Sequence, residues 1–142
     1  MATFQFDLVS PEKLLFSGEV TQVDVPGSEG DFGVLPGHTP LLSMLKIGEL
    51  WYRQGQEKHY LAVAFGFVEV LPDRVTVLAQ VGERAQEIDV QRAERAKQRA
   101  EQRLAQAQPH LTAVDLDIER ARISLLKSLI RLQVATRART RV

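Results

Sequence analysis

Residues 26–40 of this chain read PGSEGDFGVLPGHTP, and this stretch decides the fold. Four of its fifteen residues are glycine and three are proline. A helix is excluded here, because proline lacks an amide donor and fixes φ, while glycine loses the most chain entropy in a regular element. Alternating apolar residues, Val23 and Val25, precede the stretch, and an apolar run at 41–47 follows it. We therefore predict a strand, a turn, a short strand at 32–35, a second turn and another strand.

The sequence on both sides has the pattern of a β-sandwich. Phe4, Phe6 and Leu8 alternate with polar residues, which is the period of a strand buried on one face. Further strand-like runs, separated by turns, lie at residues 14–16, 20–25, 49–53, 59–63, 66–70 and 75–78. Strands that recur every ~8 to 12 residues are typical of a sandwich or barrel. We predict an antiparallel β-sandwich that continues to about residue 84.

From Ile88 onward the apolar pattern takes the period of a helix. Asp89 is placed to cap the first-turn amides, and Ile88 can pack on Ala93 as a hydrophobic staple. Pro109 disfavours helical geometry at the residue before it and ends this helix. The predicted stripe of small residues comprises Ala93, Ala96, Ala100, Leu104 and Ala107. A short link then implies an antiparallel two-helix hairpin.

A second helix is predicted over about residues 113–136, with a box-like start at Thr112 and Asp115. Its predicted seam comprises Val114, Ile118, Ala121, Leu125, Leu129 and Leu132. Other apolar residues lie outside this seam, namely Leu116, Ile123, Leu126, Ile130 and Val134. One thin helix cannot cover so much apolar surface, so this helix needs another partner, either the sandwich or another subunit.

Composition and charge limit the class of protein. Hydrophobic residues make up 44% of the 142 residues and charged residues 25%, which excludes a disordered chain. No apolar run approaches the ~20 residues of a membrane span, and the N-terminus lacks a signal-peptide pattern. Residues 1–86 carry six basic and eleven acidic residues, whereas residues 87–142 carry twelve and seven. We predict two modules with this boundary, the second suited to an acidic partner surface.

No group of residues points to catalysis. A GxxxxGK phosphate loop is absent, and the glycines in residues 27–33 are spaced GxxGxxG, which differs from the dinucleotide fingerprint. The histidines His38, His59 and His110 lack a second ligand at metal-binding spacing. Without cysteine, disulfides and thiolate chemistry are excluded. We therefore predict a protein that is not an enzyme and holds no metal.

Four stretches, in the right order, resemble the epsilon subunit of bacterial F-type ATP synthases. The match at residues 26–42 is the most specific. The others are residues 6–18, 64–70 and 83–104, which resemble the opening strand pair, the later signature strand and the first helix of the C-terminal hairpin. The resemblance covers nearly the whole chain. It implies the fold predicted above, an N-terminal sandwich followed by a helical hairpin.

The resemblance also implies a function. In this family the chain is a non-catalytic subunit of the central stalk, and its sandwich links the gamma subunit to the membrane ring of c subunits for rotary, proton-coupled ATP synthesis. Its helices reach the alpha and beta subunits and oppose ATP hydrolysis. Such a subunit is a peripheral membrane protein on the cytoplasmic side of the bacterial membrane. By the resemblance, Asp31 faces the c ring and His38 lies near gamma, although His38 alternatively only closes the turn at 36–37.

Residues 88–93, IDVQRA, resemble the I-D-x-x-R-A nucleotide-binding motif known in part of the epsilon family. The resemblance implies regulatory ATP without hydrolysis, and it implies no required cofactor. The assigned residues are Glu83, Ile88, Asp89, Arg92, Ala93, Arg99, Lys127 and Arg131. Ile88 and Ala93 would flank the adenine, and Glu83 and Asp89 would fix its polar edges. The phosphates would be faced by the four cations, Arg92, Arg99, Lys127 and Arg131. Lysine at 127 departs from the family's arginine and lacks the planar fork for bidentate phosphate contacts.

Two alternatives stay open beside this interpretation. Asp89 alternatively serves only as a helix cap, with the arginines solvated and without a ligand. A stand-alone adaptor whose basic hairpin binds nucleic acid is the rival function. Acidic residues interleaved with the basic ones count against it, as do the absence of aromatics after residue 67 and of any nucleic-acid motif.

Overall fold

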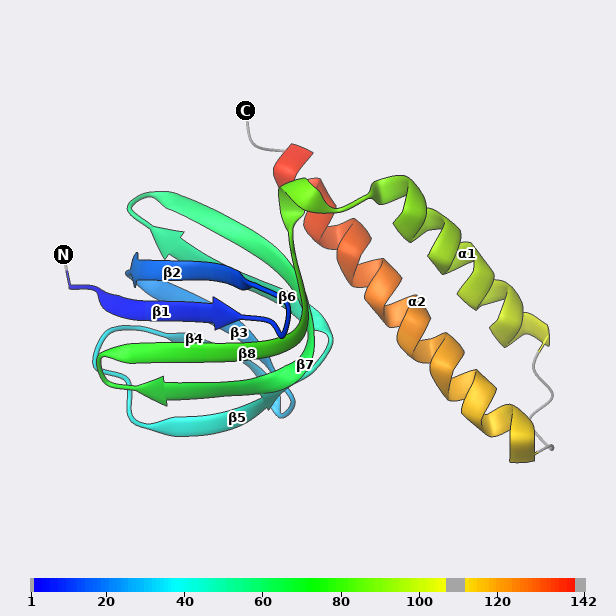
Figure 1. Ribbon diagram of the computed structural model, residues 1–142, viewed down its shortest axis with the longest axis horizontal. Helices are drawn as coiled ribbons and strands as arrows, with labels where there is room; N and C mark the ends of the chain where they lie inside the picture. The colour runs from blue at the N-terminus through cyan, green and yellow to red at the C-terminus, as the bar shows by residue number, and fades with distance from the viewer. Residues whose placement is uncertain (1, 107–111, 140–142) are drawn as a thin grey trace. The chain divides into compact units, whose positions relative to one another are not determined.

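The computed structural model describes residues 2–106 and 112–139, and side-chain surroundings are described for these residues except 112–116 and 139. The chain divides into two compact units, Met1–Ala85 and Gln86–Val142, which are described separately. Figure 1 labels the elements of both units.

The described part of the first unit forms a β-sandwich of eight strands. They are β1 (Phe4–Val9), β2 (Leu14–Val20), β3 (Gln22–Gly27), β4 (Gly30–Val34), β5 (Leu41–Leu45), β6 (Gly48–Gln54), β7 (Glu57–Leu71) and β8 (Arg74–Arg84). The strand order is β2-β1-β8-β7-β5-β3-β4, and β6 pairs with β3 and β7. The predicted sandwich is confirmed, and its pairs are antiparallel apart from the parallel pair of β1 and β8.

The core lies between the sheets and follows the predicted alternation. Phe4, Phe6 and Leu8 of β1 are at most 3% exposed, while the residues between them are half-buried. Val23 and Val25 of β3 are fully buried beside them in the same core. β3 and β5 flank the glycine- and proline-rich stretch, which forms β4 and two turns as predicted.

The predicted separate strands at 59–63 and 66–70 are wrong, because both belong to the fifteen-residue strand β7. The first half of β7 pairs with β6 up to Val63, and the second half pairs with β5 from Gly66 onward. Between the two halves, Phe65 has a φ of 59° and Gly66 a φ of 131°. This bend turns β7 from one sheet into the other, and β8 pairs with it on both sides of the bend. The sequence pattern alone did not distinguish such a bend from a turn.

Gly66 has no room for a side chain. A Cβ atom here would lie 1.8 Å from the carbonyl oxygen of Leu78, and its φ is one that L-residues rarely adopt. We expect Gly66→Ala to lower the free energy of unfolding by about 2 to 5 kcal/mol, through backbone strain and overpacking. Urea unfolding of the purified chain measures this.

The matched control is Gly33→Ala, because Gly33 lies in β4 and a side chain fits there. A Cβ atom at residue 33 would lie no closer than 3.7 Å to its nearest neighbour, Asp24 Oδ2, which is an ordinary van der Waals contact. We expect a change within about 0.5 kcal/mol for this variant. Equal destabilisation by the two substitutions would contradict a special role for Gly66.

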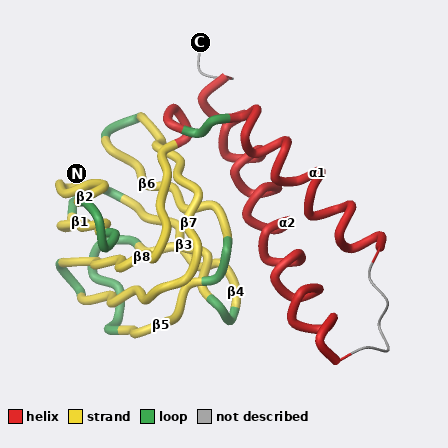
Figure 2. The backbone as a smooth tube through the Cα atoms, turned by 45° about the vertical axis from the view of Figure 1, so that its right-hand side comes forward, coloured by secondary structure: helices red, strands yellow, loops and turns green. Residues whose placement is uncertain are grey.

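The second unit contains a 3₁₀ turn, η1 (Ala85–Glu87, beginning at the unit boundary), and two helices, α1 (Val90–Gln106) and α2 (Thr112–Arg139). The helices pack side by side and run antiparallel, which confirms the predicted hairpin (Figures 1 and 2). Asp89 Oδ1 accepts a hydrogen bond from the amide of Arg92 at 3.0 Å, which confirms the predicted N-cap. None of the described helices is long and apolar enough to span a bilayer.

The buried residues of the two helices agree only in part with the predicted stripe of α1 and the predicted seam of α2. Leu129 of that seam is 41% exposed, so its assignment is wrong, and Val134, predicted on another face, is fully buried. Small residues spaced by seven are buried. Ala93 and Ala100 in α1 and Ala121 in α2 confirm the prediction, whereas Ser128 and Ala135 in α2 were not part of it. Small side chains let the axes of the two helices approach closely. Longer side chains such as Leu129 then lie at the edge of the contact between the helices and stay partly exposed. The predictions for Ala107, Pro109, Thr112, Val114, Asp115 and Leu116 lie outside the residues whose surroundings are described.

A polar network on the outer face joins β1 to β2 and β8. Asp7 Oδ1 accepts hydrogen bonds from Ser17 at 2.7 Å and from Gln5 at 2.9 Å. Arg74 Nη1 lies 3.3 Å from Asp7 Oδ2. The bond from Ser17, then that from Gln5, lowers the pKa of Asp7 below its usual 3.8, with a smaller contribution from the charge of Arg74. The ionised carboxylate therefore stabilises the folded chain.

This stabilisation depends on pH in a defined direction. It is complete above the unfolded pKa of about 3.8 and is lost as the pH falls through the lower folded pKa. We expect Asp7→Asn to lower the free energy of unfolding by about 1 kcal/mol at pH 7, with the difference from the parent shrinking below about pH 4. Urea unfolding over a pH series measures this. Asp73→Asn, in the neighbouring turn, is the control, and a parent-like pH profile for Asp7→Asn would contradict the role of the network.

Candidate functional site

An exposed row of apolar side chains crosses one sheet of the sandwich. Directly opposite residues on neighbouring strands share a face, and their register runs Leu14 (β2), Val9 (β1), Leu78 (β8), Phe67 (β7) and Met44 (β5). Val9 is half-buried, and the other four are between 50% and 59% exposed. We call these five residues the apolar row. Contiguous exposed apolar surface of this kind marks an interaction site more often than a solvent face.

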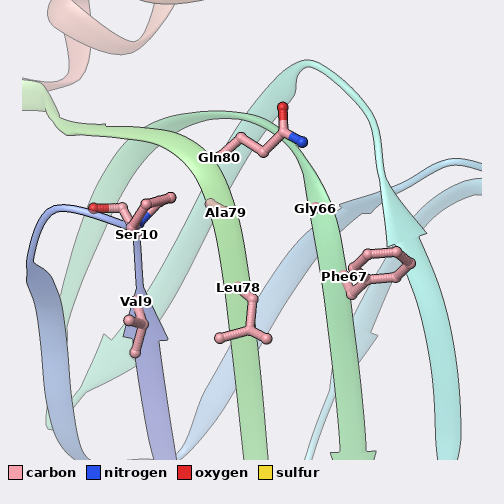
Figure 3. Close-up of a pocket in the computed structure, with 8 residues that line it drawn as sticks. Val9, Ser10, Gly66, Phe67, Leu78, Ala79 and Gln80 are labelled. Carbon is pink, nitrogen blue, oxygen red and sulfur yellow. The ribbon is translucent and has the colours of Figure 1, made fainter.

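A pocket of about 330 Å³ lies at the middle of the apolar row. Figure 3 shows the side chains of Val9, Leu78 and Phe67 on adjacent strands around it. Gly66 and Ala79 also line the pocket, and Gly66 has no side chain that would fill it. The lining is mainly apolar, so it suits a large apolar side chain of a partner protein.

Asp31, one of the two predicted interface residues, lies in β4. Its carboxylate forms an ion pair with Lys46 at 3.0 Å, and the two side chains are 63% and 47% exposed. An exposed pair of this kind contributes less than about 1 kcal/mol, so a partner can displace it at little cost. Burial of nearby Asp24, then the charge of Asp31, raises the pKa of the Asp24 carboxyl. Asp31 thus lies at an exposed acidic edge of the sandwich.

His38, the other predicted interface residue, closes a tight turn. Its amide donates to the carbonyl of Leu35 at 3.2 Å, and Gly37, with a φ of 83°, follows Pro36 inside the turn. Proline then glycine at the two central positions is typical of a type II turn. His38 Nδ1 also lies 2.6 Å from the carbonyl oxygen of Thr39, so this nitrogen is the donor. The structure thus gives His38 a structural role, and its position near gamma stays a prediction.

The residues assigned to a nucleotide are divided between the units. Glu83 lies in β8 of the first unit, and the others lie in the second. Ile88 and Ala93, predicted to flank the adenine, are only 8% and 3% exposed. Asp89 uses one carboxylate oxygen for the helix cap. The apolar pair therefore offers a purine little free surface in this structure.

The basic residues of the predicted nucleotide site lie on both helices. Arg92 and Arg99 are seven residues apart, which places them on one face of α1, and both are exposed. Lys127 and Arg131 are four residues apart on α2 and are half-buried. Because the helices are antiparallel, the start of α1 lies beside the C-terminal half of α2 (Figure 1). The hairpin thus carries positive charge on both helices.

The sequence interpretation placed the interaction surface in the turn-rich stretch and missed the apolar row. The sequence pattern predicts Met44, Phe67 and Leu78 only as strand residues. The sequence nevertheless contained an indication of this surface. In strands that alternate between buried and exposed residues, Phe67 and Leu78 are large apolar residues at exposed positions, where polar residues are expected. Only the strand order shows that these outward positions align across five strands.

Comparisons with known proteins agree on one family. The beta-sandwich domain of the ATP synthase delta/epsilon chain matches residues 3–85, and the long alpha-helix domain of the same chain matches residues 86–136. An ATP synthase epsilon chain of Nitratidesulfovibrio vulgaris is 46% identical over 93% of this chain and 95% of its own. One from Koribacter versatilis is 52% identical over 75% of each chain.

A solved structure has the same fold. A chain of the Euglena gracilis mitochondrial ATP synthase superposes with a TM-score of 0.74, at 23% identity, over 91% of this chain and 80% of that one. Neither the family models nor these relatives support the nucleic-acid adaptor. Because the two family models together span both units, the chain belongs to the family of ATP synthase epsilon chains.

Proposed function

We propose that this chain is a non-catalytic subunit of the central stalk and that its sandwich links the gamma subunit to the c ring. The apolar row is the observation that carries this proposal. Burying apolar surface contributes roughly 25 cal/mol per Å², and a row of five side chains around a pocket supplies a continuous area for a partner. Gamma is the proposed occupant, because a rigid five-strand surface suits a permanent contact that transmits torque.

The turn-rich edge is the proposed contact with the c ring. Its loops are held by the bonded turn at residues 35–38 and by the ladder of β3 with β4. The pair of Asp31 and Lys46 is exposed and easily exchanged for contacts with another subunit. Recognition residues commonly lie on such loops when a rigid scaffold positions them. The chain would then sit at the membrane surface, on its cytoplasmic side, as a peripheral part of the complex.

Charge substitutions in the apolar row test the contact with gamma. Phe67→Glu and Leu78→Glu place a carboxylate where the partner must exclude water, so we expect the affinity for purified gamma to fall at least ~30-fold. Calorimetric titration measures the affinity. Both side chains are about half exposed, so the urea unfolding midpoint should change little.

Leu126→Glu is the matched control, because Leu126 is 50% exposed but lies in α2. Its affinity for gamma should equal that of the parent. Unchanged gamma binding by Phe67→Glu and Leu78→Glu would contradict docking on the apolar row.

The helical unit is the proposed regulatory part. Residues 87–142 carry a net charge of +5, and buried alanines and a serine dominate their packing. Small side chains bury little apolar area, so association of the two helices is weakly favourable. The hairpin can therefore open at modest cost and extend toward the alpha and beta subunits, where its positive charge would meet acidic surface and oppose ATP hydrolysis.

ATP is the proposed ligand that favours the closed hairpin. Arg92 and Arg99 would contact the phosphates from α1, and Lys127 and Arg131 from α2, so only the closed form combines all four charges. Ile88, Ala93 and Asp89 would surround the base after a small local opening. A ligand at ~100 times its dissociation constant stabilises the state that binds it by about 2.7 kcal/mol, which is comparable with the difference between typical conformers.

Calorimetry with ATP and the full chain tests this proposal. We expect binding that weakens about tenfold in Arg92→Ala and in Arg131→Ala, because each loses a charge-assisted phosphate contact. Lys127→Arg should tighten binding, since arginine contacts phosphate with a planar fork. Arg122→Ala is the control, because Arg122 is an exposed arginine of α2 outside the site. If neither heat nor NMR shift changes appear at millimolar ATP, the nucleotide proposal is wrong and residues 88–93 serve only to cap the helix. The proposed role in the stalk would not be affected.

A further inference from the structure

Met44 has an unusual place in the apolar row. The chain has two methionines, Met1 at the N-terminus and Met44. It lies in β5 directly opposite Phe67 and is 56% exposed. Its backbone is fixed, since the carbonyl of Met44 accepts a hydrogen bond from the amide of Ser28 at 2.8 Å. A solvent-accessible thioether is thus held at a fixed place on the proposed docking surface.

The thioether is the group of this surface that mild oxidants attack. Hydrogen peroxide transfers one oxygen atom to the sulfur, so that the sulfur is oxidised to a sulfoxide while the peroxide is reduced to water. The sequence contains no cysteine that would compete for the oxidant. The other residues of the row, Leu14, Val9, Leu78 and Phe67, resist peroxide because they are hydrocarbons.

Oxidation changes the chemistry of the row without changing the core. A sulfoxide is a strong hydrogen-bond acceptor, and burying it without a donor costs far more than burying a thioether. Directly opposite side chains have Cβ atoms about 4.5 to 5.5 Å apart, so the new oxygen would lie within the surface that also contains Phe67. The strand itself tolerates the change, because Met44 occupies the opposite phase from Leu45, the buried residue of β5.

We propose that Met44 is an oxidative modification site: peroxide converts its thioether to the sulfoxide in the undocked chain, and the sulfoxide blocks docking of gamma on the apolar row. This inference rests on the proposed function of the row. A bound partner would cover Met44, so the modification acts on the free chain before assembly. Reduction of both sulfoxide epimers by the two stereospecific methionine sulfoxide reductases would restore docking.

The test compares the full-length parent with Met44→Leu and Met44→Gln. Each protein is treated with millimolar hydrogen peroxide, its peptides are mapped for a gain of about 16 Da at residue 44, and its affinity for purified gamma is measured by calorimetry. We expect the treated parent to bind at least ~10-fold more weakly and to recover after reductase treatment. Treated Met44→Leu should bind like the untreated parent, and Met44→Gln should bind weakly without treatment.

Several results would overturn the inference. These are an unmodified Met44 after peroxide, full affinity of the parent with Met44 oxidised, or an equal loss of affinity in treated Met44→Leu. A fall in the urea unfolding midpoint of the oxidised parent that accounts for the lost binding would also overturn it, because the effect would then be on folding. If the untreated parent and untreated Met44→Leu both fail to bind gamma, the proposed function itself fails and takes this inference with it.

Discussion

The rest of the sandwich depends on the bend in β7 at Phe65 and Gly66. This bend lets one strand pair with β6 in its first half and with β5 in its second half, so both sheets share a continuous backbone. Gly66 makes the bend possible, because the carbonyl of Leu78 occupies the space that a Cβ would need.

The same bend also sets the surface proposed for docking. Phe67 follows the bend directly, and its phase on the strand places it outside, between Leu78 and Met44. Gly66 keeps the pocket beside Phe67 open. A single backbone feature therefore aligns the core residues of β7 on one side and the docking residues on the other.

The two units differ in how they are stabilised, and this difference fits their proposed roles. The sandwich buries large side chains such as Phe6, Leu50 and Leu61, and each fully buried side chain of this size contributes about 1.5 to 3 kcal/mol. The most buried residues of the hairpin are mainly alanines, which contribute much less. A rigid unit suits a permanent link in a rotor, whereas a weakly packed hairpin suits a part that changes conformation. Within the hairpin, Asp89 caps α1 and also belongs to the proposed nucleotide site.

The sequence by itself determined the fold class, the hairpin and the cap at Asp89, because alternation, helical period and turn chemistry are local properties of the chain. It also placed the nucleotide residues by resemblance, without testing them. Only the tertiary structure decided that residues 57–71 form one bent strand and that Leu129 is exposed while Ser128 is buried. The apolar row likewise appeared only with the fold, since Leu14, Val9, Leu78, Phe67 and Met44 come from five strands. Strand order and register bring such residues together, and both are set by packing between segments that are distant in the sequence.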